Sequence, residues 1–282
     1  MHESDGEDEF LSCPLGPISD AGRKMGKQTS ELSQQTPSNS LLKTRLVMKP
    51  VAYPNPQEAV VIAATEFLME ETMKKFDSSH DAHHVRRVRK TALSLAHSVE
   101  PKPDLLTVEL AALLHDLLDK KYVPRSASAD PFSHFFPFFK DLAEKTNGEI
   151  DLIGDGRAEN ISRIVENVSW TNERKLKAEG GWTEWHETCI ELHCVQDADR
   201  LDAIGAFGIM RCAAYSAAVD RALHVSKSDP TWGDSAIHHF HDKLLLVRDR
   251  LKTPAGRRMG DRRHQFMLEF LSAVDEEYNA KP

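Results

Sequence analysis

One apolar stretch of this sequence carries charged side chains where a hydrophobic core would exclude them. Nearly all residues from Val108 to Leu118 are aliphatic, in a run that ends in the segment LLHDLLDK. His115, Asp116 and Asp119 interrupt the C-terminal end of this run. An uncompensated buried carboxylate costs roughly several kcal/mol. A cation or a dense set of hydrogen bonds must therefore compensate Asp116.

The composition limits the class of protein. The chain has 282 residues, 40% of them hydrophobic, and a formal net charge of −8. This charge gives no basic footprint for duplex binding, so nucleic acid is not expected as a partner. No apolar run approaches the roughly 20 residues of a membrane span, and the acidic N-terminus is unlike a secretory signal. No membrane partner is expected.

The cysteines indicate the compartment. Cys13, Cys189, Cys194 and Cys212 show neither CxxC nor disulfide-framework spacing, which is typical of proteins in a reducing compartment. We therefore expect a soluble cytoplasmic protein, with the nucleus as the alternative. The oligomeric state is not fixed by the sequence, and a homodimer is compatible with it.

Composition also divides the chain into two parts. Residues 1–50 open with the acidic HESDGEDE and continue through a stretch rich in Ser, Gln and Gly with little aliphatic content. Such a composition cannot bury a core, so residues 1–50 are predicted to be a disordered tail. Residues 51–282 are predicted to form a single domain.

Helical periodicity recurs through that domain, and no segment shows convincing period-two alternation. Asn55 and Pro56 supply a helix N-cap and a proline at the first helical position. Further helices are expected around residues 84–99, 107–119, 130–147, 161–170 and 261–278. The segment NERKLKAEGGW (172–182) is expected to be a solvated connection, and TPAG (253–256) a turn. The chain is therefore predicted to be all-α.

Polar residues also enter the core upstream and downstream of LLHDLLDK. His84 heads a helical stripe of core positions, and Arg87 lies one turn on, where a buried-side arginine needs an anion. An inward histidine alone is more often a core residue with one hydrogen bond than a ligand. In the stretch 196–210, Asp197, Asp199 and Asp202 alternate with apolar residues, which argues against a solvated acidic face.

These residues together can form a metal site. His84, the His115-Asp116 pair and one aspartate of the stretch 196–210 supply two imidazoles and two carboxylates from three helices. This set suits one divalent ion such as Mn²⁺, Fe²⁺, Co²⁺, Ni²⁺ or Mg²⁺, with about two positions left for water and substrate. Open positions indicate catalysis, because structural zinc sites more often use thiolates and close the fourth position.

The same residues carry a family resemblance. The series His84-x-x-Arg87, His115-Asp116 and ADRL at 198–201 resembles the H…HD…D pattern of HD-domain metal-dependent phosphohydrolases. Longer segments resemble the small HD hydrolases of the YpgQ/YedJ group: HDxxHxxRV at 80–88, LAALLHDLLDKK at 110–121, VQDADRLDAIGAFGI at 195–209, HFHDKLL at 239–245 and TxxGRxxxxxRxxFMxxFL at 253–271. The resemblance covers about residues 55–275 and implies one HD-domain helical bundle.

The resemblance implies a ligand set. The metal ligands would be His84, His115, Asp116 and Asp199. Asp197 is the rival for the last position, and the ADRL pattern of the family favours Asp199. Among the divalent ions, Mn²⁺ is the first expectation, with Fe²⁺, Co²⁺, Ni²⁺ and Mg²⁺ as alternatives.

The resemblance also implies catalytic and substrate-binding residues. Asp119 falls where related HD hydrolases keep a carboxylate, and it would orient or deprotonate water or protonate the leaving oxygen. Many relatives have glutamate there, and aspartate has a shorter reach. The expected phosphate contacts are Lys120 and Arg87 in catalysis, and Lys121, Lys243 and Arg263 in substrate binding. Lys243 and Arg263 are equally compatible with surface helix pairing.

The implied activity is hydrolysis of nucleotides. The YpgQ/YedJ resemblance implies release of pyrophosphate from nucleoside triphosphates. The same ligand set is compatible with a phosphomonoesterase on nucleoside monophosphates. A nucleotide-binding or signalling module without turnover is a third interpretation, which the acidic Asp119 argues against.

Overall fold

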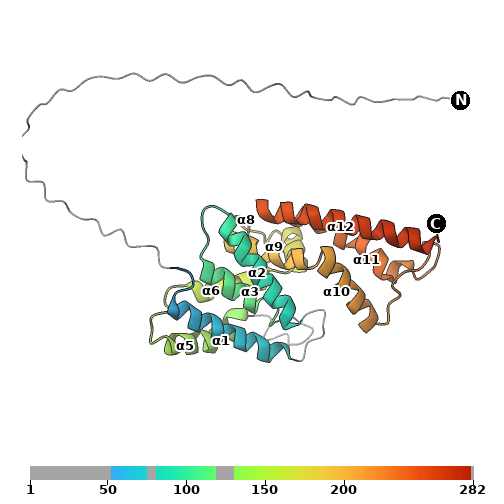
Figure 1. Cartoon of the computed structure of the whole chain (residues 1–282). Coiled ribbons are helices and arrows are strands. Elements are labelled where there is room, and N and C mark those ends of the chain that lie inside the picture. Colours follow the sequence, from blue (N-terminus) through green and yellow to red (C-terminus); the bar gives the residue numbers. More distant parts are fainter. Residues whose placement is uncertain (1–51, 75–80, 119–129, 281–282) are drawn as a thin grey trace, which may run out of the picture. The chain divides into compact units, whose positions relative to one another are not determined.

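Helices joined by turns and loops make up this computed structural model (Figure 1). The structure describes residues 52–74, 81–118 and 130–280. Among these residues there is no strand, so the all-α prediction is confirmed. The tail predicted over residues 1–50 lies outside the described residues, and the domain boundaries stay a prediction. No helix in the described ranges combines the length and apolar character that a bilayer span requires.

The helices follow one another closely along the chain. They are α1 (Pro56–Met73), α2 (Ala82–Ser98), α3 (Leu105–Leu114), α5 (Pro131–Lys145), α6 (Arg157–Asn167), α7 (Trp170–Glu179), α8 (Glu184–Thr188), α9 (Ile190–Asp202), α10 (Gly205–Ala218), α11 (Ala236–Asp242) and α12 (Pro254–Tyr278). Short 3₁₀ segments flank α11, namely η1 (Trp232–Asp234), η2 (Leu244–Leu246) and η3 (Arg248–Arg250).

Helix α1 begins where the sequence predicts. The Asn55 side-chain oxygen accepts hydrogen bonds from the backbone N–H groups of Gln57 and Glu58, each at 2.9 Å. The Glu58 carboxylate in turn accepts from the Asn55 N–H at 2.7 Å, which completes a capping box. Pro56 occupies the first helical position, where its missing N–H costs nothing.

The prediction for residues 172–182 is wrong. Most of this segment belongs to helix α7, and Glu173 points inward and is only 2% exposed. Its carboxylate Oε2 accepts a 2.5 Å hydrogen bond from Nη2 of Arg200 on α9. Because the segment is rich in Lys and Glu, its composition does not distinguish the buried Glu173, which Arg200 of α9 neutralises, from the exposed charges around it.

The start of α12 also differs from the prediction. The helix begins at Pro254, well before Asp261. The Thr253 hydroxyl oxygen accepts a hydrogen bond from the Gly256 N–H at 3.0 Å, and Pro254 follows at the first helical position. The TPAG segment is therefore the N-cap and first turn of α12 rather than a separate turn.

Helices α2, α3 and α9 pack on one another at the centre of the bundle. Helix α3 is the most enclosed, because every residue from Leu106 to Leu114 is buried. Helices α1 and α6 pack on α3 as well, which leaves its sides no access to solvent. Polar side chains at the adjoining parts of α2, α3 and α9 are thereby brought together inside the protein.

A glycine is required where α9 gives way to α10. Gly205 has φ of +76°, and a Cβ at this position would lie 2.9 Å from Cγ of Arg263. A left-handed conformation costs about 1–2 kcal/mol in other residues, and the contact with Arg263 adds to it. We expect Gly205→Ala to lower the free energy of unfolding by about 2 kcal/mol in urea denaturation. Gly233→Ala, with open space around its Cβ, is the control, and equal losses in the two variants would contradict the prediction.

Candidate metal centre

Two histidines meet inside the bundle. His84 lies in the first turn of α2, and His115 is the residue that ends α3. Their ring centroids are 5.4 Å apart, and each side chain is only 1% exposed. The two imidazoles therefore meet edge to face in a region from which solvent is largely excluded.

Two carboxylates lie against the Nε2 atoms of these rings. Asp116 places Oδ2 at 3.4 Å from His84 Nε2 and Oδ1 at 3.5 Å from His115 Nε2. Asp199 on α9 places Oδ1 at 3.5 Å and 3.9 Å from the same two nitrogens. We call these four residues the His-Asp cluster. Ligand atoms of His84, His115 and Asp199 all lie within 4.8 Å of one another, close enough for one ion.

The Nδ1 atoms set the tautomer of both rings. Nδ1 of His84 lies 2.7 Å from Asp202 Oδ2, and Nδ1 of His115 lies 2.8 Å from the carbonyl oxygen of Ala112. A proton on each Nδ1 leaves the Nε2 lone pairs directed at the carboxylates, as metal ligation requires. Nε2 of His115 is buried and has no hydrogen-bond partner among the described residues. The donor set of His84, His115 and Asp199 therefore fits a divalent cation, and Asp116 lies against the same two nitrogens.

Negative charge dominates the electrostatics of the cluster. Burial alone would lower the pKa of His84. Hydrogen bonds with Asp116, Asp199 and Asp202 outweigh burial and raise this pKa from 6.5 to about 10. Burial alone would raise the pKa of Asp199, but its hydrogen bond with His84 and the charge of His115 lower it. A site that holds a proton this strongly has the charge needed to hold a cation in its place.

Asp202 is a functional candidate to which the sequence assigned no role. Its Oδ2 atom accepts from His84, and the same carboxylate accepts two hydrogen bonds from Arg87, at 2.8 and 2.9 Å. Arg211 on α10 adds a third donor at 3.1 Å. The available indication was spacing, since Asp202 lies three residues after Asp199 and shares its face of the helix.

Asp197 has a different set of partners. It is fully buried, and its carboxylate accepts hydrogen bonds from the backbone N–H groups of Lys252 at 2.8 Å and Thr253 at 2.7 Å. The Thr253 hydroxyl donates to the same carboxylate at 2.8 Å. Asp197 therefore anchors the segment that leads into α12, and Asp199 is the α9 carboxylate that lies against His84 and His115.

Comparisons with known proteins point to one family. The HD domain family model matches residues 81–204, a range that contains the whole His-Asp cluster. YpgQ of Bacillus subtilis is 33% identical over 202 residues, which cover 71% of this chain and 85% of YpgQ. The chain belongs to the HD-domain family, in its YpgQ-like branch. Protein L803 of Acanthamoeba polyphaga mimivirus is 28% identical over 207 residues, covering 65% of this chain and 82% of that protein.

Solved structures share the fold of this HD domain. An HD-superfamily hydrolase from Bacillus thuringiensis superposes with a TM-score of 0.57 at 28% identity, covering 79% of this chain and 100% of that chain. Bacillus subtilis YpgQ in complex with ADP superposes with a TM-score of 0.55 at 27% identity, covering 77% of this chain and 97% of that chain. The architecture described above is therefore that of HD-superfamily hydrolases.

Two predicted phosphate contacts of the HD domain have protein partners. The Arg87 guanidinium bonds to Asp202 and lies 4.3 Å from the centre of the Phe207 ring. Arg263 on α12 donates a hydrogen bond to the backbone carbonyl of Leu201. Both arginines thus contact the C-terminal end of α9. Their predicted roles toward substrate stay predictions.

Of the remaining predicted site residues, the structure describes only Lys243. Lys243 is exposed at the C-terminal end of α11. Asp119, Lys120 and Lys121 lie outside the described residues. The acid-base and phosphate-binding roles expected for these four residues therefore remain predictions.

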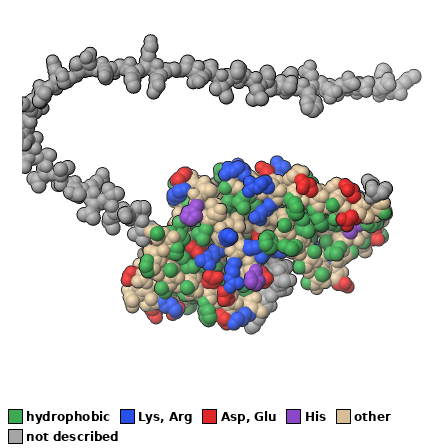
Figure 2. Space-filling model, in the orientation of Figure 1, with side chains coloured by type: hydrophobic (Ala, Val, Ile, Leu, Met, Phe, Trp, Pro, Cys, Tyr) green, Lys and Arg blue, Asp and Glu red, His purple; other side chains and the backbone are tan. Residues whose placement is uncertain are grey.

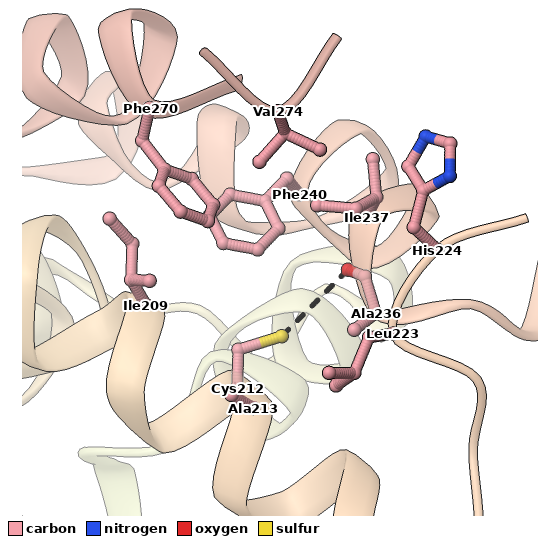
Figure 3. Close-up of a pocket in the computed structure, with 10 residues that line it drawn as sticks. All are labelled: Ile209, Cys212, Ala213, Leu223, His224, Ala236, Ile237, Phe240, Phe270 and Val274. Carbon is pink, nitrogen blue, oxygen red and sulfur yellow. Dashed lines mark hydrogen bonds between the residues drawn. The ribbon is translucent and has the colours of Figure 1, made fainter. Parts of the chain in front are cut away.

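An apolar pocket of about 190 Å³ lies among α10, α11 and α12 (Figure 3). It is lined by Ile209, Cys212, Ala213, Leu223, His224, Ala236, Ile237, Phe240, Phe270 and Val274. Figure 2 shows apolar side chains in the region of α10 and α12, and basic and acidic side chains over the face in view, including the upper edge along α12. The pocket lining contains no lysine or arginine and no residue of the His-Asp cluster, so it is unsuited to a phosphate group.

Proposed function

We propose that this HD protein is a divalent-metal-dependent phosphohydrolase that acts on nucleotides. The observation that carries the proposal is the convergence of two imidazole Nε2 atoms and two carboxylates inside the bundle. When bound, a divalent ion supplies a Lewis acid that activates water and neutralises phosphate charge. Mn²⁺ is the proposed ion, because nitrogen and carboxylate ligands in equal number suit a borderline metal.

The residues of the cluster have complementary tasks in this proposal. His84 and His115 present Nε2, with their Nδ1 protons held by an acceptor on the opposite side of each ring. Asp116 and Asp199 supply the negative charge that attracts the cation. Asp119, three residues after Asp116 in the sequence, is proposed to move the proton of the attacking water or of the leaving oxygen.

The substrate class rests on the relatives. The YpgQ structure in complex with ADP shows that a protein of this branch binds a nucleoside diphosphate. We infer a nucleoside triphosphate as the substrate of this chain. Water would add to the α-phosphorus and the α,β-anhydride bond would break, which yields a nucleoside monophosphate and pyrophosphate.

Metal removal and a nucleotide panel test the proposal. Protein treated with EDTA is expected to lose hydrolysis by at least about 1,000-fold, because the ion contributes several kcal/mol to the transition state. Mn²⁺, Mg²⁺, Co²⁺ and Ni²⁺ are then added back one at a time, with nucleoside triphosphates and monophosphates as substrates. Pyrophosphate and nucleoside monophosphate in equal amounts are the expected products. Inorganic phosphate from monophosphates would instead indicate a phosphomonoesterase, and no hydrolysis with any ion would refute the proposal.

A further inference from the structure

We infer that Asp202 is a positioning residue that fixes the orientation and tautomer of His84, and that two arginines hold Asp202 in place. Arg87 reaches it from α2, and Arg211 reaches it from α10. We call Asp202, Arg87 and Arg211 the Asp202 clamp. The inference rests on the proposed function in one respect, because it takes His84 to be a metal ligand.

The clamp makes the two histidines of the cluster unequal. His84 donates its Nδ1 proton to a carboxylate at 2.7 Å, whereas His115 donates to the neutral carbonyl of Ala112 at 2.8 Å. A hydrogen bond to an ionised acceptor is roughly twice as strong as one to a neutral acceptor. It also raises the basicity of the opposite ring nitrogen. Nε2 of His84 is therefore expected to be the more firmly held and more strongly donating of the two ligand atoms.

The arginines keep Asp202 in the state that this task requires. The carboxylate is only 7% exposed, and a buried carboxylate without partners would be strongly destabilising. Two guanidinium groups and one carboxylate give the clamp a net positive charge. The clamp therefore adds no further negative charge beside the cluster. An ionised Asp202 can only accept from Nδ1, whereas a protonated one could donate to it and reverse the tautomer.

This geometry changes the expected role of Arg87. Its Nε and Nη2 atoms are both used by Asp202, and its guanidinium lies against the Phe207 ring. The planar fork of arginine matches the two carboxylate oxygens, which the single ammonium group of lysine cannot do. Arg87 therefore acts through Asp202, and Arg87→Lys is expected to be a poor replacement.

The affinity for Mn²⁺ in titration calorimetry tests the clamp. Asp202→Asn is expected to weaken binding by about 10- to 100-fold, the usual cost of removing a partner of a ligating histidine. Arg211→Met is also expected to weaken Mn²⁺ binding, and it provides the test if Asp202→Asn does not fold. Arg258→Met, on the exposed face of α12, is the matched control and should bind as the wild type does. Folded Asp202→Asn and Arg211→Met variants that both bind within about two-fold of wild type would overturn the inference.

A double-mutant cycle separates positioning from a general structural effect. In a His84→Ala background, Asp202→Asn is expected to cause no further loss of Mn²⁺ affinity, because Asp202 acts through that ring. If Asp202→Asn lowers the Mn²⁺ affinity as much in the His84→Ala background as in the wild type, the inference is overturned. The ¹⁵N-imidazole spectrum of Mg²⁺-loaded protein should show a hydrogen-bonded Nδ1 proton on His84 that changes in Asp202→Asn. These measurements do not depend on turnover, so an inactive protein with an intact clamp would refute only the proposed function.

Discussion

Asp199→Asn is expected to abolish divalent-metal binding and to lower kcat/KM by at least about 1,000-fold, or about 4 kcal/mol. The asparagine keeps the shape of the side chain and removes one of the two carboxylate charges that face His84 and His115. Metal content per protein chain and hydrolysis of nucleotides are the measurements.

Asp197→Asn provides the matched control, two residues away on the same helix. It should retain full metal content and activity, because Asp197 bonds to Lys252 and Thr253 rather than to the cluster. It should lower the free energy of unfolding by about 2–3 kcal/mol, the scale of hydrogen bonds to a charged group. The opposite pattern, with metal lost in Asp197→Asn and kept in Asp199→Asn, would assign the ligand to Asp197.

Residues at the centre of the bundle could be predicted because the sequence pattern that marks each of them lies within a single helix. A histidine and an aspartate inside a largely aliphatic run leave few explanations besides a compensated buried charge, so His115 and Asp116 could be picked out as candidate site residues without a structure. Helical spacing placed His84 on the core side of its own helix, and that side chain is 1% exposed. The fold class followed from the same periodicities, since no segment alternated with period two.

Pairing between distant helices could not be predicted in the same way. Arg87 and Asp202 are 115 residues apart, so the sequence showed an arginine that needed an anion without showing which anion. A substrate phosphate and a protein carboxylate satisfy that need equally well. The same holds for Arg200, whose partner Glu173 lies in a segment where neighbouring lysines and glutamates concealed the one buried acid.

Glu173→Gln is expected to be strongly destabilising, because it breaks a buried ion pair away from the cluster. The carboxylate accepts from Arg200 at 2.5 Å and from Lys177 at 2.8 Å, and Lys252 Nζ lies 3.3 Å away. Removing one partner of a buried ion pair costs about 3–5 kcal/mol. That loss corresponds to a fall in Tm of roughly 6 to 20 °C for a domain of this size. The double variant Glu173→Gln, Arg200→Met is the control. It should be more stable than Glu173→Gln alone, because it no longer leaves the Arg200 charge buried without a counter-charge.

The dependence of this loss on pH gives a second test. Burial alone would raise the pKa of Glu173, but the charge of Arg200 and the hydrogen bonds from Lys177 and Arg200 lower it from 4.5 to about 2. A carboxylate with a lowered pKa in the folded state stabilises the protein above its unfolded pKa and ceases to do so as the pH falls through the folded pKa. The wild type should therefore lose stability faster than Glu173→Gln between about pH 5 and pH 2. Urea denaturation across this range should show a smaller difference in the free energy of unfolding between the two proteins at the acid end. A constant difference across the range would mean that Glu173 stabilises the fold by packing rather than by its charge.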